Sequence, residues 1–350
     1  MANEVEKVNT IEIADIEKIM GKDDDDIEKL SGFEFTGVIT YTWLGSRTVL
    51  AGGDVSSAGW SNVIQYKTLA SDANTSDFGD LNSARAGMYA GSNVSRGVFA
   101  GGYGYSGGIV YGVTDTDYVT VGSTGNGSDF GNLDQKAGAW NGGASNGTLL
   151  FCTGGFYQDG SYVRTNRMEY FTIASASDGT DAGNLGTAVT GGATASGFTR
   201  FLVWLGYDGT NLLNTVEYGT FHTSNDTSDF GDLGDGSYNG GMLADNSRAV
   251  TMTRQDGITG KLDTMEYFTV GSTGNATDFG DLTEARTEGG CASDGTRGEV
   301  YGGEEDTAGE VNTIEKITIQ SAGDSADVGD LTTAGSTSGV CRKMGALSGT

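Results

Sequence analysis

Four Asp-Phe-Gly triplets are the residues in this sequence that most directly suggest catalysis. They lie at residues 77–79, 129–131, 229–231 and 278–280. In a protein kinase such a triplet holds Mg²⁺ and occurs once, near a catalytic loop. Here it recurs at a regular spacing, which indicates a structural turn. The Ser-Asp-Gly-Thr sequence at 293–296 could similarly be taken for a sialidase Asp box, but Asp and Gly are common turn residues and no Trp follows.

Histidine and cysteine offer little for metal or redox chemistry. His222 is the only histidine, so a copper centre built on several His ligands is excluded. Cys152, Cys291 and Cys341 fall in predicted strands, where a free Cys behaves as a small apolar side chain. We expect no disulfide, no catalytic nucleophile, no metal and no cofactor.

The triplets belong to a longer repeat, Asp-x-Gly-[Asp/Asn]-Leu. Its first residue is Asp77, Asp129, Asp181, Asp229, Asp278 or Asp327, at spacings of 52, 52, 48, 49 and 49 residues. Eleven residues before each Asp stands a Tyr, except in the last copy, which has Lys316. Six copies in register indicate six structural units.

Each unit contains four short predicted strands. The first is made of small residues, the second is apolar, the third alternates with period two, and the fourth holds the Asp-x-Gly motif. The second strands are predicted at 47–53, 96–102, 149–155, 200–206, 248–254 and 298–303. The third strands are predicted at 63–69, 117–121, 168–173, 215–221, 264–270 and 313–319.

Four strands in about 50 residues is the period of a kelch blade. The paired glycines that close most second strands, and the aromatic residue of the third, resemble the kelch motif over residues 35–345, although the late Trp is missing. The resemblance implies an all-β, six-bladed kelch-like β-propeller with a short N-terminal extension. Seven blades are the alternative, because both 37–43 and 336–342 resemble first strands. We expect one of these two segments to close the ring by completing a blade with strands from opposite chain ends.

A polar residue stands before each third-strand aromatic, or before Lys316. These residues are Gln65, Asp117, Glu169, Glu217, Glu266 and Glu315. Propeller symmetry would arrange them in a ring, and a ring of carboxylates could hold Ca²⁺. The alternative, which we favour, is that they are the polar positions of a pleated strand.

The segment that joins the second strand to the third varies in length, and aromatic residues gather in it. Such loops emerge on one face of a propeller, where partner contacts can vary. Aromatics there suit sugar or protein contacts. The candidate binding residues are Trp60, Tyr103, Tyr105, Tyr111, Phe156, Tyr157, Tyr162 and Tyr207.

Residues 1–34 differ from the 35–350 propeller. They carry Ile-Glu-Lys-Ile at 16–19 and Ile-Glu-Lys-Leu at 27–30, eleven residues apart. These copies resemble short tandem repeats near the N-termini of phage virion proteins, and the whole chain resembles kelch-like structural proteins of marine cyanophages. The apolar residues of the 1–34 segment are too dispersed to form a core, so we expect them to dock on a partner. They are Ile11, Ile13, Ile16, Ile19, Ile27 and Leu30.

Composition limits the function further. Sixty glycines, no proline and a net charge of −27 exclude collagen-like sequence and argue against nucleic-acid or anionic-membrane partners. No apolar stretch is long enough to span a bilayer and no signal peptide is readable. We expect a non-enzymatic virion protein, displayed on the head, neck or tail, whose partners are other virion proteins. The alternatives are an adhesin that binds a host-surface glycan and a glycosidase, which would need two facing carboxylates.

Overall fold

The computed structural model describes residues 45–55, 59–106, 109–138, 142–158, 162–221, 226–332 and 345–349, and six two-residue strands before residue 45. The chain divides into two compact units, Met1–Thr42 and Trp43–Thr350. In the first unit the strands pair two by two: β1 (Lys7–Val8) with β2 (Ile11–Glu12), β3 (Lys18–Ile19) with β4 (Lys22–Asp23), and β5 (Lys29–Leu30) with β6 (Phe33–Glu34).

The pairs β1–β2, β3–β4 and β5–β6 begin at Lys7, Lys18 and Lys29, so they repeat every eleven residues. The sequence around Lys18 and Lys29 gave two copies of this repeat. The structure adds a third copy at Glu6-Lys7-Val8, where Val replaces the Ile or Leu of the other two.

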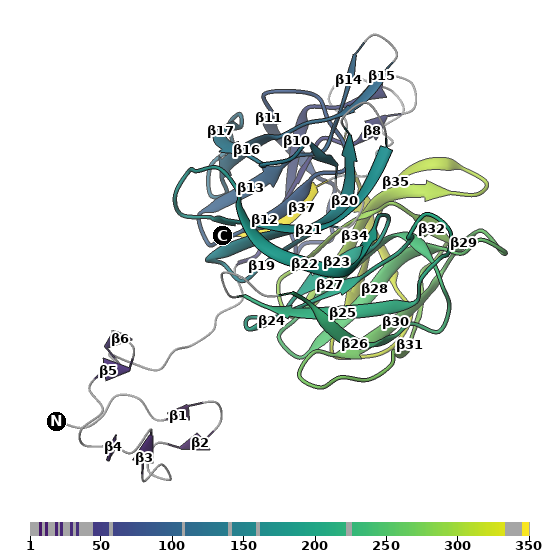
Figure 1. The fold of residues 1–350 in the computed structure, drawn as a ribbon. Helices are drawn as coiled ribbons and strands as arrows, with labels where there is room; N and C mark the ends of the chain where they lie inside the picture. Colours follow the sequence, from purple (N-terminus) through teal and green to yellow (C-terminus); the bar gives the residue numbers. More distant parts are fainter. Residues whose placement is uncertain are drawn as a thin grey trace. The chain divides into compact units, whose positions relative to one another are not determined.

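The second unit is a six-bladed β-propeller of antiparallel sheets (Figure 1). Strands are given from the inner to the outer edge of each blade. Blade 1 consists of β37 (Gly345–Gly349), β7 (Arg47–Ala51), β10 (Val63–Thr68) and β11 (Ser76–Asp80). Blade 2 consists of β12 (Tyr89–Ser92), β13 (Arg96–Ala100), β16 (Asp115–Thr120) and β17 (Ser128–Asn132), and blade 4 of β23 (Ala193–Ser196), β24 (Arg200–Trp204), β25 (Thr215–Thr220) and β26 (Ser228–Asp232).

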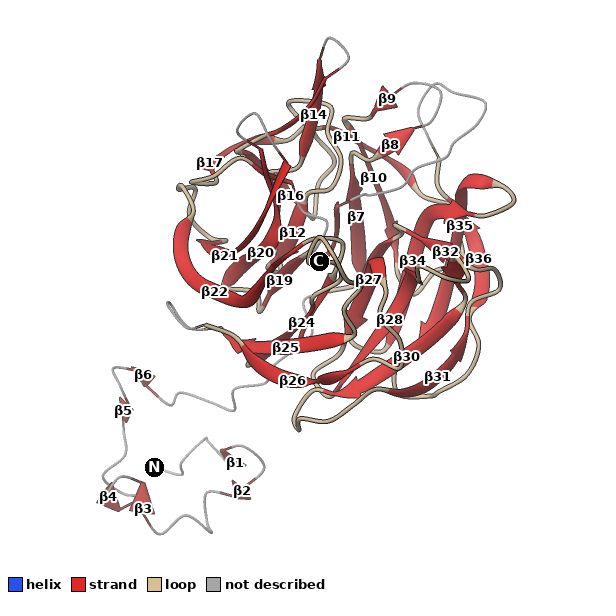
Figure 2. Cartoon of the chain, turned by 45° about the vertical axis from the view of Figure 1, so that its right-hand side comes forward, coloured by secondary structure: helices blue, strands red, loops and turns tan. Residues whose placement is uncertain are grey.

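The other three blades carry additional short strands. In blade 3, β18 (Ala137–Gly138) and β19 (Gly143–Ser145) form the inner edge, followed by β20 (Leu149–Gln158), β21 (Tyr162–Thr172) and β22 (Thr180–Val189). Blade 5 consists of β27 (Tyr238–Ala244), β28 (Arg248–Gln255) with β29 (Lys261–Leu262), β30 (Thr264–Thr269) and β31 (Thr277–Asp281). In blade 6, β32 (Arg286–Thr287) and β33 (Gly290–Ser293) form the inner edge, followed by β34 (Arg297–Glu305), β35 (Gly309–Thr318) and β36 (Ala326–Asp330). The described residues contain no helix, as Figure 2 shows.

Blade 1 takes its inner strand from the C-terminal end of the chain, which confirms closure by both chain ends. The position predicted for that strand was wrong. The closing strand is Gly345–Gly349, whereas 37–43 and 336–342 lie outside the described residues. Thr48 and Gly298 are each the second residue of their second strand. Ser348 pairs with Thr48 as Ser293 pairs with Gly298 in blade 6, so this register identifies β37 as the inner strand of blade 1.

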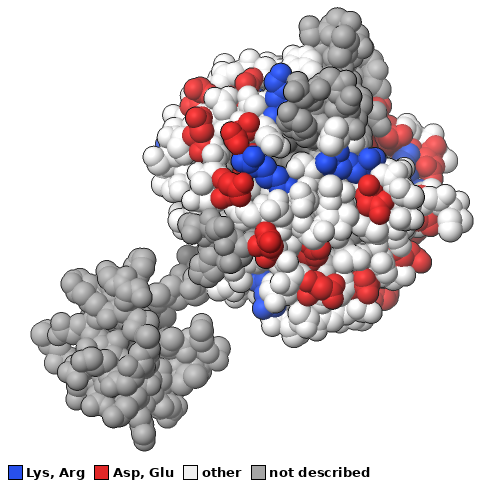
Figure 3. Space-filling view, viewed as in Figure 1, with Lys and Arg blue, Asp and Glu red and all other residues white. Residues whose placement is uncertain are grey.

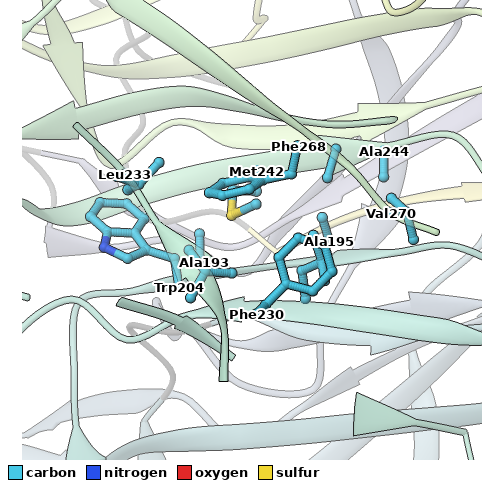
Figure 4. Packing of buried hydrophobic residues seen from close by; sticks show 12 residues of the cluster. Ala193, Ala195, Trp204, Phe230, Leu233, Met242, Ala244, Phe268 and Val270 are labelled. Atoms are coloured by element: carbon cyan, nitrogen blue, oxygen red, sulfur yellow. The ribbon is translucent and has the colours of Figure 1, made fainter. Parts of the chain in front are cut away.

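The hydrophobic core lies between blades rather than within one sheet. Figure 4 shows this for blades 4 and 5, where Trp204 and Phe230 pack with Met242 and Phe268. We call each interface between consecutive blades a seam and name it by its two blades. Because every described blade buries apolar side chains on both faces, its second and third strands are apolar enough to be recognised from sequence.

The connections between second and third strands extend some blades into hairpins. β8 (Asp54–Val55) pairs with β9 (Gly59–Trp60), β14 (Tyr103–Ser106) pairs with β15 (Ile109–Gly112), and the β20–β21 and β34–β35 pairs continue past their sheets. In antiparallel blades these connections leave the same end of every sheet. We call that side of the propeller the hairpin face.

Candidate functional site

The six polar residues predicted as a ring lie one in each seam. In every seam the side-chain oxygen accepts a hydrogen bond from the backbone N–H of the residue that follows the motif leucine of the preceding blade. The N···O distances are 2.8–3.2 Å. We call these acceptors latch residues. The donor and acceptor pairs are Asn82 and Asp117, Asp134 and Glu169, Gly186 and Glu217, Gly234 and Glu266, Thr283 and Glu315, and Thr332 and Gln65.

Four latch carboxylates are also paired with an arginine. Arg85 Nη2 lies 2.9 Å from Asp117, Arg254 Nη1 lies 2.6 Å from Glu266, and Arg286 contacts Glu315. Arg167 Nε lies 3.4 Å from Glu169. The carboxylates are therefore occupied by interactions within the protein. Among the described residues, no group of three or more His, Cys, Asp or Glu is arranged to hold a metal ion.

A second contact crosses every seam, and sequence reasoning missed it. Three residues before each motif Asp stands an Asn or Asp, whose Oδ1 accepts from the backbone N–H of the fourth motif residue in the preceding blade. The N···O distances are 2.9–3.1 Å. The acceptors are Asn74, Asn126, Asp178, Asp226, Asn275 and Asp324. Their constant place in the repeat is the signal that could have revealed them.

The Asp-Phe-Gly triplets are structural, as predicted. Phe230 is buried and packs edge-on against Tyr218, with ring centroids 5.9 Å apart. Gly231 has φ +151°, and a Cβ there would lie 2.3 Å from the carbonyl oxygen of Gly274 in the next blade. The Ser-Asp-Gly-Thr sequence is also a turn, because Asp294 Oδ1 accepts from the backbone N–H groups of Thr296 and Arg297.

A cavity of about 120 Å³ lies among the inner strands of blades 2 to 6. Its lining is neutral and mostly small, with Ser92, Ser145 and Ser196 beside Met242 and Cys291. The serines bond to neighbouring blades: Ser145 Oγ donates to the Ser92 carbonyl, and Ser196 Oγ accepts from the Ser145 N–H. The cavity could hold a few waters, since each takes about 30 Å³ in the liquid.

Both described thiols are held in the protonated form. Burial raises the pKa of the Cys291 thiol to about 12 and that of Cys152 well above its ordinary value. A thiol that stays protonated at neutral pH is a poor nucleophile. Cys341 and His222 lie outside the described residues.

The hairpin face brings some of the predicted aromatic residues into contact. Trp60 packs on Tyr103 with ring centroids 6.2 Å apart. Arg164 lies between two rings, with its Cζ 5.2 Å from the Phe156 centroid and 4.6 Å from the Tyr207 centroid. This arrangement joins the connections between the second and third strands of blades 3 and 4.

The predicted aromatics differ in how much surface they offer. Tyr103 and Phe156 are buried, Trp60 and Tyr207 are half-buried, and Tyr111 is 41% exposed. Val163 and Ile258, which were not singled out from sequence, are exposed on the connections of blades 3 and 5. The side chains of Tyr105, Tyr157 and Tyr162 lie outside the described set, as do those of the predicted docking residues Ile11, Ile13, Ile16, Ile19, Ile27 and Leu30.

Charge is dispersed over the side of the propeller that Figure 3 shows. Acidic side chains are spread over the part drawn in colour, with a few Lys and Arg between them. No helix in the described part of the chain has the length and apolar character needed to cross a bilayer. No model of a protein family matches the sequence, and no curated protein matches it either. The assignment to a six-bladed propeller therefore rests on the sheet order.

Proposed function

We propose that the protein is a non-enzymatic structural component of a phage particle, a propeller module displayed on the head, neck or tail and anchored by residues 1–34. The observation that carries the proposal is the repeated polar chemistry of the seams. All six latch residues accept a backbone hydrogen bond from the preceding blade. A propeller whose repeated acids are committed to holding blades together suits a rigid, displayed module.

Two further observations support this proposal. Residues 1–34 fall within one compact unit, Met1–Thr42, and the ring within the other, Trp43–Thr350, so docking and display can be assigned to different units of the chain. The eleven-residue repeat of the leader, now with three copies, strengthens its resemblance to the tandem repeats of phage virion proteins. The kelch-like blade pattern fits the same class of structural protein.

Deletion of residues 1–34 tests the division between leader and ring. We expect a soluble propeller with a nearly unchanged melting temperature that no longer loads onto particles, measured by immunolabelling and by quantitative mass spectrometry of purified particles. A second variant replaces the six predicted docking residues by serine and keeps the charges of the leader. If the apolar side chains make the docking contact, it should also fail to load. Normal occupancy of the deletion variant would place attachment on the propeller instead, and labelling confined to host cytoplasm would remove the virion assignment.

A second candidate is glycan or receptor binding by the hairpin face. The observation that favours it is that the hairpin face carries an exposed ring, Tyr111, in blade 2 and half-buried rings, Trp60 and Tyr207, in blades 1 and 4. Glycan-array binding that Tyr111→Ala weakens would support this function. The control is Val94→Ala, which changes an exposed residue in the turn between β12 and β13, at the opposite end of blade 2. Turnover of a bound glycan would instead indicate a glycosidase.

A further inference from the structure

One seam of the propeller differs in chemistry from the other five. Two positions in the repeat face each other across a seam. One is the third residue of the second strand, such as Val49 in blade 1. The other is two residues after the latch residue of the next blade, such as Val119 after Asp117 in blade 2. Four of these pairs belong to shared apolar clusters: Val49 with Val119, Val98 with Phe171, Leu202 with Phe268, and Val250 with Ile317. In seam 3–4, Gly219 leaves room for Phe201, which packs on Phe151 with centroids 5.2 Å apart.

In seam 6–1 the same two positions hold Glu299 and Lys67. Lys67 Nζ lies 3.0 Å from Glu299 Oε1, and the two side chains are 2% and 0% exposed. Arg297 Nε donates to the same oxygen at 2.7 Å. The Tyr301 hydroxyl bonds to Glu299 Oε2 at 2.5 Å and contacts Thr48 Oγ1 of blade 1 at 3.1 Å.

A second set of charges surrounds this buried pair. Asp72, in the loop of blade 1, accepts from Arg297 at 2.7 Å and from Lys316 at 2.9 Å. In blades 1, 2, 4 and 5 the equivalents of Arg297 and Lys316 are an arginine stacked on a tyrosine. Lys316, which breaks the Tyr pattern of the repeat, thus lies in the seam where the two ends of the blade array meet.

Near-identical blades create a folding problem that these charges can solve. If blade 6 closed on blade 2, Glu299 would face Val119 and blade 1 would be left out. If blade 5 closed on blade 1, Lys67 would face Val250 and blade 6 would be left out. With blade 5 on blade 1, Lys67 would be buried without a partner, which is strongly unfavourable. With blade 6 on blade 2, Glu299 would lose Lys67 and keep only Arg297 and Tyr301 of its own blade. The correct ring pairs Lys67 with Glu299. Burial alone already lowers the pKa of Lys67, an effect that Glu299 opposes.

We propose that the buried Lys67–Glu299 pair determines which blades close the ring, by making five-bladed closure costly rather than by adding stability to the six-bladed form. Specificity through the exclusion of wrong partners is a known use of buried polar groups. The proposal does not depend on the function of the protein.

The test is refolding of the full chain from denaturant, followed by size-exclusion chromatography with light scattering and by limited proteolysis with mass spectrometry. Lys67→Val combined with Glu299→Val makes seam 6–1 resemble seam 1–2. We expect this variant to keep most of its thermal stability but to give several-fold more monomer in which blade 1 or blade 6 is cleaved. The control Val250→Ala weakens seam 5–6 without altering any charge. It should lower the melting temperature and still refold to one species.

Two reciprocal variants make the test independent of how well the double variant folds. Val119→Lys gives Glu299 a wrong partner on blade 2, so cleavage should concentrate in blade 1. Val250→Glu gives Lys67 a wrong partner on blade 5, so cleavage should concentrate in blade 6. The proposal is overturned if the double variant refolds uniformly to one protease-resistant monomer, or if the reciprocal variants show no such preference between blades.

Discussion

The latch residues show what a single side chain contributes to a propeller seam. Five are carboxylates and one is an amide, yet all six accept the same backbone N–H. The feature that they share is a side-chain oxygen at a fixed place on the third strand. Charge is an addition, and in four of the five carboxylates it is compensated by an arginine from one of several parts of the repeat, such as Arg85 before β12 and Arg254 at the end of β28.

Glu169 provides a test because its charge is costly. Burial raises the pKa of Glu169, although the Asp134 N–H and Arg167 oppose that shift. A carboxyl with a raised folded pKa stabilises the fold below its unfolded pKa of about 4.3, and this contribution is lost as the pH rises through the folded pKa. Glu169→Gln keeps the acceptor, as Gln65 does in blade 1, and cannot ionise.

We therefore expect the melting temperature of Glu169→Gln minus that of wild type to be higher at pH 7.5 than at pH 4.5. Differential scanning fluorimetry at the two pH values measures this difference. Glu284→Gln, at an exposed position, is the control and should show nearly the same offset at both. A Glu169→Gln offset that becomes less favourable as the pH rises would mean that the charge itself stabilises the seam.

At this scale the sequence predicted positions better than contacts. The six polar residues were recognised, and the favoured interpretation was that they are simply the polar positions of a pleated strand. Their acceptor role could not be read from the repeat, because each donor is a backbone N–H from the preceding blade and leaves no trace in residue type. Tyr103 and Phe156 were predicted to be surface aromatics but are buried. Their burial depends on hairpin contacts between blades, which the sequence of one repeat does not reveal.

At the scale of the element, the outer strand explains why the Asp-x-Gly motif is so regular. Its Phe or equivalent fills the seam, its Leu is buried, and its Gly passes against the loop of the next blade. In addition, the fourth residue binds the next blade through both its N–H and its carbonyl, as Asp80 does with Asn126 and Gly127. One five-residue segment therefore carries much of the contact between two blades.

Gly231→Ala should be destabilising for two reasons, the backbone conformation and the lack of space for a Cβ. The backbone has φ +151°, and the new Cβ would meet the Gly274 carbonyl oxygen. Backbone strain of this kind costs about 1–3 kcal/mol, and displacement of the loop adds to it. Urea unfolding measures the loss. The matched control is Gly271→Ala, where a Cβ has open space and φ is not in the left-handed region. Equal effects of the two substitutions would refute this account.

The second, third and outer strands could be predicted because each combines a periodic pattern with a fixed motif. The closing strand could not, for a physical reason. Inner strands consist of small residues with no distinctive period, so several segments near the C-terminus match equally well. Only the pairing of Ser348 with Thr48 distinguishes Gly345–Gly349 from its neighbours.

At the scale of the whole molecule, interactions of different kinds close the ring, and three of them illustrate the range. β37 supplies the missing strand of blade 1, Gln65 accepts from Thr332, and the Lys67–Glu299 pair lies in the same seam. All three join residues far apart in the sequence. Local repeat contacts can therefore form first, and the closed ring requires the two ends of the blade array to meet.

Removal of residues 345–350 should open the ring. Five register pairs between β37 and β7 would be lost, which corresponds to on the order of 3–5 kcal/mol of net hydrogen-bond energy. The exposed edge of β7 would then be free to pair with another chain. We expect a broader unfolding transition at lower denaturant and concentration-dependent oligomers by light scattering. Removal of Thr350 alone is the control. A truncated chain that stays monomeric and unfolds at the wild-type midpoint would show that β37 is dispensable.

The latch hydrogen bonds also make each seam separately observable. Six backbone amides, one per seam, are protected from solvent exchange only while their seam is shut: Asn82, Asp134, Gly186, Gly234, Thr283 and Thr332. Their deuterium uptake would report the opening free energy of each seam without any label or substitution. Thr332 alone monitors the joint between the first and last blades, so comparing it with the other five would show whether the ring opens at its closure or elsewhere.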